Sequence, residues 1–220
     1  MTTIEIKNIS KIINKNVVLN QISFAMESGN IYGMQGVNGS GKTMLMRMLI
    51  GLIHPTEGEI YINGKLLGKD IEFPESIGFL LENPTFLGRY SGLQNLKMLA
   101  SMKNVISEED VIAVFQEVGL DKEAMNKKYR KYSLGMKQRL GIAAAIMEKP
   151  DIILLDEPTN ALDESGIDLV KNIVQRQKER GALVVISCHD SAILQTLSDY
   201  IIKLKEGSID GEIFSLDKSV

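Results

Sequence analysis

The chain has 220 residues and a formal net charge of −3, with 44% hydrophobic and 24% charged residues. This is the composition of an ordinary globular protein, large enough for one domain that carries an insertion. The negative balance excludes bulk attraction to nucleic acid or anionic lipid, and the single cysteine excludes an internal disulfide and fits a reducing compartment.

The first part of the chain is predicted to be rich in strands. Alternating apolar and polar residues indicate the early strands, and the Asn63-Gly64 pair is a turn signal. Gly51 ends a helix that follows a glycine-rich turn. The predicted elements are strands at 4–6, 17–19, 22–26 and 31–34, a helix at about 42–50, and strands at 59–62 and 77–81.

The pattern changes to helices over about 91–147, where Ser107 and Asp110 resemble a capping box. Continuous apolar runs then predict buried strands at 152–155 and 183–187, with a helix between them that begins near Glu164. The alternation of strands and helices indicates an α/β fold with a parallel sheet and crossover helices. The helical stretch is expected to be an insertion in that sheet.

A glycine-rich segment follows the strand at 31–34. Residues 36–43, GVNGSGKT, fit the pattern G-x-x-x-x-G-K-[ST], in which backbone N–H groups and a helix N-terminus face a polyphosphate. Lys42 is expected to reach the β- and γ-phosphates, and the Thr43 hydroxyl to bind Mg²⁺. The alternative is a chance match, but the strand–loop–helix context favours a phosphate site. The predicted nucleotide-binding residues are Gly36, Asn38, Gly39, Ser40, Gly41, Lys42, Thr43 and Met44.

Two acids follow the buried strand at 152–155, at the edge of the sheet where open α/β folds bind ligands. Asp156 is expected to hold Mg²⁺ directly or through water, and Glu157 to act as the general base on the attacking water. The alternative is that both acids simply lie in solvent at the end of the strand. The phosphate loop found earlier in the chain favours a hydrolysis site. His189 follows the neighbouring strand, so a γ-phosphate contact is favoured over a structural role, whereas Cys188 is read as a buried filler.

The segment 132–139, YSLGMKQR, alone predicts a loop in which Ser133 caps the next helix. Combined with the phosphate loop and the acidic strand, however, the sequence resembles the ABC ATPase family. There the common form is LSGGQ, and its serine and glycine bind the γ-phosphate held by the opposite subunit. The resemblance implies that Ser133, Gly135 and Met136 act on the ATP of a partner subunit.

The resemblance covers about residues 4–210. Residues 158–163, PTNALD, look like the family's D-loop with Asp163, and residues 187–190, SCHD, look like its switch region. It implies a P-loop NTPase (RecA-like) fold with a parallel-sheet core, an N-terminal antiparallel β subdomain and an inserted α-helical subdomain. The expected division is an ATP-binding core, with its antiparallel β subdomain, at 1–82 and 151–220, and a helical signature subdomain at 83–150.

Several positions depart from the family pattern. Leu134 and Met136 replace the glycine and glutamine of the signature. Glu82 stands where the family has the glutamine of its Q-loop, which makes it a candidate metal ligand. Ile13 stands where most members place an aromatic on adenine, which makes it a further candidate nucleotide-binding residue. The signature form and the glutamate resemble the bacitracin-type branch, whose members export antibiotics or peptides.

The resemblance implies a nucleotide-dependent homodimer or heterodimer that works with a transmembrane permease subunit. Each ATP, with Mg²⁺, would lie between the phosphate loop of one subunit and the signature of the other. The chain itself has no apolar run of the roughly 18–20 residues that a membrane helix needs. The expected location is therefore the cytoplasm, peripheral on the inner face of the cell membrane.

Other functions are weighed against transport. An ABC ATPase without a transport role, such as one for iron–sulfur cluster assembly, remains an alternative. A small-molecule P-loop kinase does not account for Ser133, Asp163 and His189 together. The basic cluster at 127–131 has little aromatic interleaving in a net negative chain, so no nucleic-acid partner is expected.

Overall fold

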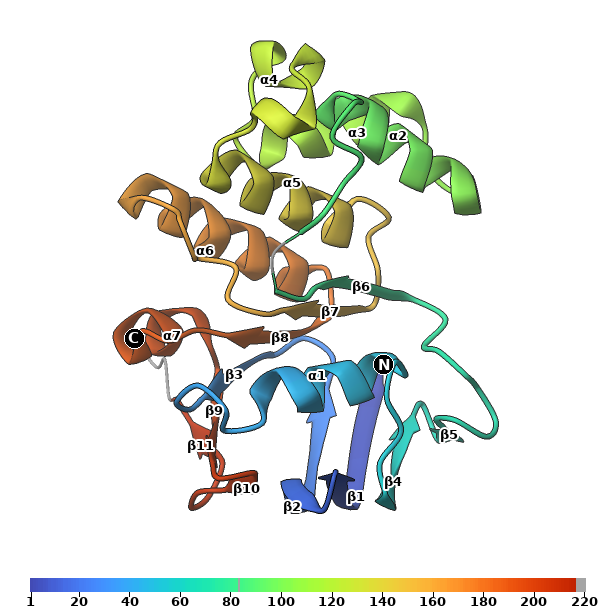
Figure 1. Cartoon of the computed structure of the whole chain (residues 1–220), viewed down its shortest axis with the longest axis vertical. Helices are drawn as coiled ribbons and strands as arrows, with labels where there is room; N and C mark the ends of the chain where they lie inside the picture. Colours follow the sequence, from blue (N-terminus) through green and yellow to red (C-terminus); the bar gives the residue numbers. More distant parts are fainter. Residues whose placement is uncertain (83, 217–220) are drawn as a thin grey trace.

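A computed structural model of the chain describes residues 1–82 and 84–216 (Figure 1). The N-terminal strands form an antiparallel sheet, drawn in blue and cyan at the bottom of the figure, with the order β2-β1-β4-β5. Its strands are β1 (Thr3–Ile13), β2 (Asn16–Glu27), β4 (Glu57–Ile62) and β5 (Lys65–Leu66).

The expected strands at 17–19 and 22–26 prove to be one continuous strand, β2. The pairing of β1 with β2 shifts register between Ile6 and Ile12, and Asn8 and Gln21 adopt positive φ values of 50° and 48°. Such irregularities bend a strand and increase its twist without ending it. The prediction of two strands was therefore wrong, because a bulge interrupts the alternating pattern in the same way as the end of a strand.

The second sheet has the order β10-β9-β3-β8-β7-β6, with β11 also pairing with β9. The pairs from β9 through to β6 are parallel, as predicted. Strand β9 was not predicted from the sequence, and it pairs with β3, the strand that leads into the glycine-rich loop. The strands are β3 (Ile31–Gln35), β6 (Ile77–Leu80), β7 (Ile152–Leu155), β8 (Leu183–Ser187), β9 (Tyr200–Lys205), β10 (Ser208–Ile209) and β11 (Phe214–Ser215).

Helices cover both faces of the parallel sheet. In Figure 1, α1 lies on the side of the antiparallel sheet, α5 and α6 lie on the opposite side, and α2 to α4 gather above α5 at the top. Residues Ser107 and Asp110 form the predicted capping box at the start of α3. The helices are α1 (Lys42–Ile50), α2 (Gly92–Lys103), α3 (Glu108–Glu117), α4 (Lys122–Asn126), the 3-10 helix η1 (Tyr129–Lys131), α5 (Leu134–Ile146), α6 (Glu164–Glu179) and α7 (Ser191–Leu197).

Strand β7 lies between two apolar cores, and all its side chains are buried. Ile152 and Leu154 pack into the core shared with α1 and the antiparallel sheet, whereas Ile153 and Leu155 pack into the core shared with α5 and α6. Alternate side chains of a strand point to opposite faces, so a strand covered on both sides must be apolar throughout. This packing fixes the acidic residues that follow β7 at the edge of the sheet.

The predicted helical insertion contains α2 to α5, and its assignment as a separate subdomain at 83–150 stays a prediction. In the described residues, no helix combines the length and apolar character needed to cross a bilayer.

Candidate active site

The segment 36–41 joins the end of β3 to the start of α1. A β-carbon on Gly36 would lie 2.4 Å from the carbonyl oxygen of Leu204, and one on Gly41 would lie 2.5 Å from the side chain of Leu19. Gly41 also has a φ of 108°, which residues with a side chain rarely adopt. The close approach of backbone to neighbouring strands therefore requires glycine at both positions and shapes the loop as a cradle.

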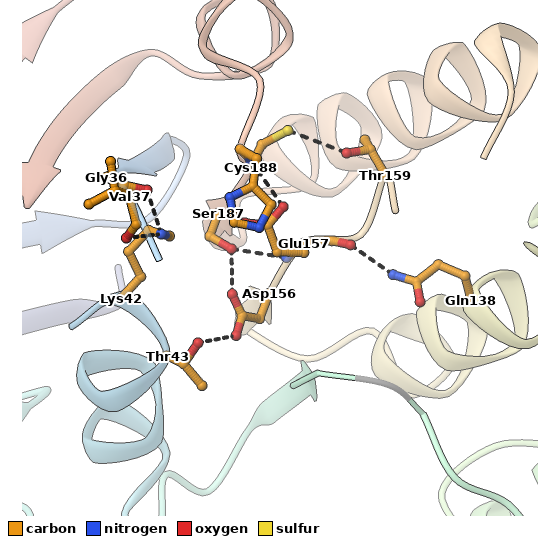
Figure 2. A network of polar contacts seen from close by, with 11 residues as sticks. Gly36, Val37, Lys42, Thr43, Gln138, Asp156, Glu157, Thr159, Ser187 and Cys188 are labelled. Carbon is orange, nitrogen blue, oxygen red and sulfur yellow. Dashed lines mark hydrogen bonds and ion pairs between the residues drawn. The ribbon is translucent and has the colours of Figure 1, made fainter. Parts of the chain in front are cut away.

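Lys42 begins α1, and its side chain is buried, with 6% of its surface exposed. Its ammonium group donates to the carbonyl oxygens of Gly36, at 2.6 Å, and Val37, at 3.2 Å (Figure 2). No carboxylate pairs with it in the described part of the chain. A buried cation without a counter-ion, at a helix N-terminus and beside the unpartnered hydroxyl of Ser40, fits an anionic ligand such as a polyphosphate.

Thr43 and Asp156 meet at the mouth of this cradle. The Thr43 hydroxyl donates to Asp156 Oδ2 at 2.6 Å, and the Ser187 hydroxyl donates to Oδ1 of the same buried carboxylate (Figure 2). The described residues contain no group of three or more His, Cys, Asp and Glu side chains arranged to hold a metal. Mg²⁺ typically uses one or two protein ligands together with phosphates and water, so this pair of oxygens fits Mg²⁺ bound with a nucleotide.

Glu157 and His189 face each other beside Asp156. The backbone N–H of His189 donates to Glu157 Oε2 at 3.0 Å, and its Nε2 lies 3.2 Å from Oε1. Burial raises the pKa of the Glu157 carboxyl above its ordinary value, and the nearby imidazole opposes that shift. Cys188 is buried, as predicted, and its sulfur lies 3.3 Å from the Thr159 hydroxyl oxygen (Figure 2).

These groups surround one cavity of about 430 Å³. The structure thus brings together side chains from α1, the ends of β6, β7 and β8, and α5. Gly36 contributes through its carbonyl contact with Lys42. The predicted residues that line the cavity are Asn38, Gly39, Ser40, Gly41, Lys42, Thr43, Met44, Glu82, Asp156, Glu157 and His189.

The cavity wall also includes residues that sequence reasoning did not assign, namely Val18, Arg47, Gln138 and Asn160. Two of them lie within segments already quoted as motifs, the signature and the D-loop. Arg47 follows Thr43 by four residues on α1, and that spacing places two side chains on the same face of a helix. These signals were therefore present in the sequence, whereas Val18 had none.

Glu82 follows β6 and lies at the edge of the cavity with a positive φ of 54°. Its carboxylate forms an ion pair with Arg47 of α1. Its role as a metal ligand stays a prediction, and in that role the carboxylate would have to exchange Arg47 for the metal ion.

Ile13 lies at the end of β1, with 38% of its surface exposed, and does not line the cavity. Val18, near the start of β2, is the apolar side chain from this hairpin that does. Contact of Ile13 with the adenine base stays a prediction, and Val18 is the alternative that the geometry offers.

Three predicted signature residues, Ser133, Gly135 and Met136, do not line the cavity of their own chain. Ser133 is exposed and caps α5 as predicted, accepting from the Met136 N–H at 3.2 Å. Gly135 lies in the first turn of that helix. Asp163 caps α6 by accepting from the Gly166 N–H at 3.0 Å. Both side chains therefore cap their helices, and both residues are exposed.

The sequence profile described as ABC transporter matches residues 19–160 of this chain. The chain belongs to the ABC transporter family. It is 48% identical to the uncharacterized ABC transporter ATP-binding protein YybJ of Bacillus subtilis, over 94% of both chains. It is 37% identical to the bacitracin transport ATP-binding protein BcrA of Enterococcus faecalis, over 96% of this chain and 68% of that protein. It is 34% identical to the lantibiotic transport ATP-binding protein SrtF of Streptococcus pyogenes, over 94% of this chain and 88% of that protein.

Solved ABC structures share the fold. The ATP-binding subunit of an ABC transporter superposes with a TM-score of 0.86 at 26% identity, covering 97% of this chain and 90% of that one. A dimeric bacterial ABC transporter cassette gives a TM-score of 0.88 at 24% identity, covering 98% of this chain and 100% of that one.

The predicted fold class and family are confirmed: the chain is an ATP-binding subunit of an ABC transporter and an ATPase. The roles of single residues stay predictions.

Proposed function

We propose that this subunit hydrolyses ATP to drive export of a peptide, antibiotic or other amphipathic compound through a separate membrane permease. The observation that carries the hydrolytic part is the joining of the Lys42 cradle to Asp156 and Glu157 in one cavity. The printed functions of two relatives, bacitracin transport and lantibiotic transport, support the cargo class. In this proposal the protein is peripheral on the inner face of the cell membrane.

Five side chains of the cavity have distinct parts in the proposed reaction. Lys42 and the loop N–H groups bind the β- and γ-phosphates. Thr43 and Asp156 would hold Mg²⁺, which would neutralise developing phosphate charge. Glu157 accepts a proton from the attacking water. His189, beside Glu157, contacts the γ-phosphate.

A transport assay tests this proposal. The tagged chain is purified with its permease from detergent-solubilised membranes and reconstituted in vesicles. ATP and labelled bacitracin or a lantibiotic are supplied together on the side that the ATPase faces. We expect ATP-dependent movement of one of these peptides, abolished in a matched preparation that carries Lys42→Ala. Recovery of the chain without any multi-helix membrane protein would contradict the transport role and favour a non-transport ABC ATPase.

We further propose that each catalytic site is completed by a second subunit packed head to tail. Ser133 is exposed and does not line its own cavity, which supports a contact with the γ-phosphate of a partner's ATP. Ser133→Asp should keep the helix cap, because aspartate is also a good N-cap. Its negative charge should repel the partner's phosphate, since like charges across an interface cost several kcal/mol. We expect turnover to fall more than tenfold while the monomer's ATP affinity is unchanged.

Ser133→Arg should block the same closure by bulk. Ser101→Arg is the control, because Ser101 is also an exposed serine, lies within α2 and does not line the cavity. Its replacement should leave turnover unaffected. Turnover is followed by phosphate release and binding by titration calorimetry. Loss of ATP binding by the monomeric Ser133→Asp protein would contradict a site shared between two subunits.

The proposed base also predicts a pH dependence. Because burial raises the pKa of Glu157 above its ordinary value of 4.5, the carboxylate should be protonated, and lost as a base, at a higher pH than a solvated glutamate. Turnover at saturating ATP should therefore fall on the acid side, with a midpoint above that value. In His189→Gln the midpoint of the residual activity should move higher still, because the imidazole lowers this pKa. An unmoved midpoint would argue against the pairing.

A further inference from the structure

Glu157 has an unusual backbone for a residue with a side chain. Its φ is 51°, in the left-handed region, directly after the buried strand β7. This conformation costs an L-residue roughly 1–2 kcal/mol and persists only where neighbouring groups enforce it. The enforcing contacts are therefore part of what aims the Glu157 carboxylate.

Two side chains from different elements hold the backbone of Glu157, one at its N–H and one at its carbonyl oxygen. The Glu157 N–H donates to Ser187 Oγ at 2.9 Å, at the end of β8. The Gln138 side-chain amide of α5 donates to the Glu157 carbonyl oxygen at 2.9 Å (Figure 2). Gln138 is buried, with 4% of its surface exposed, although it lines the cavity. The two peptide units that flank the Glu157 α-carbon are thus each held by a side chain from another element.

The Gln138 contact is not needed to satisfy a buried polar group. The Glu157 carbonyl also accepts the Asn160 N–H, at 3.1 Å, within its own loop. Removing Gln138 would therefore leave that carbonyl with a partner, and the desolvation cost of an orphaned group would not arise. What would be lost is the tie between α5 and the left-handed peptide.

We propose that Gln138 is a positioning residue for hydrolysis, which fixes the Glu157 peptide and couples it to the helix that begins at the signature serine. The inference rests on the proposed role of Glu157 as general base. Ser133 and Gln138 lie at the same end of α5, about 7.5 Å apart along the axis at 1.5 Å per residue. A shift of α5 on engagement of Ser133 with a partner's ATP therefore moves the group that holds Glu157.

The test begins with Gln138→Met, which keeps length and volume but removes the donor. A misplacement of a reacting group by about 1 Å can cost a hundredfold, so we expect kcat to fall by roughly ten- to a hundredfold while ATP affinity stays within about twofold. Gln177→Met is the matched control. Gln177 is a buried glutamine of α6 that accepts from Arg180 at 2.6 Å and does not line the cavity, so its replacement should leave kcat unchanged.

A double-mutant cycle then separates positioning from a general structural role. If Gln138 acts only through Glu157, Gln138→Met should cost less than about twofold in single-turnover hydrolysis when Glu157→Gln is already present. An equal loss in both backgrounds would overturn the inference. Gln138→Leu gives the same comparison if the methionine protein does not fold.

The two proposals fail differently. Wild-type kcat in Gln138→Met, with an inactive Glu157→Gln, would remove Gln138 and leave the base assignment standing. Wild-type kcat in Glu157→Gln would remove the base assignment itself, and a loss confined to Gln138→Met would then show that this glutamine acts through another group.

Discussion

Glu157→Gln is expected to lower ATP turnover by about 10²- to 10⁴-fold, the range that a general base contributes. The amide preserves the shape of the side chain, and its oxygen still accepts the His189 N–H that now bonds Oε2. The backbone clamp by Ser187 and Gln138 does not involve the carboxylate and should persist. ATP affinity should therefore be retained, and ATP-bound dimers should accumulate.

Phosphate release and gel filtration with ATP and Mg²⁺ measure both effects. Glu109→Gln serves as the control, because Glu109 is an exposed glutamate in the first turn of α3, away from the cavity. The control should keep wild-type turnover and its usual elution volume. Wild-type turnover in Glu157→Gln would eliminate this carboxylate as the base and direct attention to His189.

Lys42→Ala is expected to weaken ATP binding by about a hundredfold or more, which is about 2.7 kcal/mol. The buried ammonium group has no carboxylate partner in the described residues, so a bound polyphosphate is its natural counter-ion. It also ties the carbonyls of Gly36 and Val37, so its loss should loosen the loop as well as remove a charge. Charge-assisted hydrogen bonds of this kind are the strong ones.

Titration calorimetry with ATP measures the loss. Lys171→Ala, which removes an exposed lysine of α6, should leave the dissociation constant unchanged. Thermal unfolding without nucleotide separates loop disorder from global instability, and the Lys42→Ala protein should unfold within a few degrees of the wild type. A dissociation constant equal to that of the wild type would show that this loop is not the phosphate site.

Local patterns predicted much of the fold because their causes lie within a few residues. The helix predicted at 42–50 has those bounds, because the glycines that flank it, Gly41 and Gly51, lie next to its ends in the sequence. The strands at 152–155 and 183–187 were also predicted correctly, because burial on both sheet faces demands unbroken apolar runs. The capping hydroxyls of Ser107 and Ser133 bond N–H groups three residues away.

Features that depend on distant pairing were not predictable in this way. Strand β9 joins the sheet through its contact with β3, more than 160 residues earlier in the chain. The register shifts along β2 are defined by its pairing with β1, so they cannot be seen in the sequence of β2 alone. The same holds for Val18, whose place on the cavity wall follows from the course of the hairpin and not from any motif.

The sequence by itself determined the family, the phosphate loop and the candidate acids, because those are set by residue type and spacing. Only the tertiary structure decided how the acids are held. Gln138 and Ser187 reach the Glu157 peptide from 19 and 30 residues away, and Arg47 pairs with Glu82 across 35 residues. A left-handed peptide and an ion pair of this kind form where separate elements pack together, and a local sequence pattern has no access to that packing.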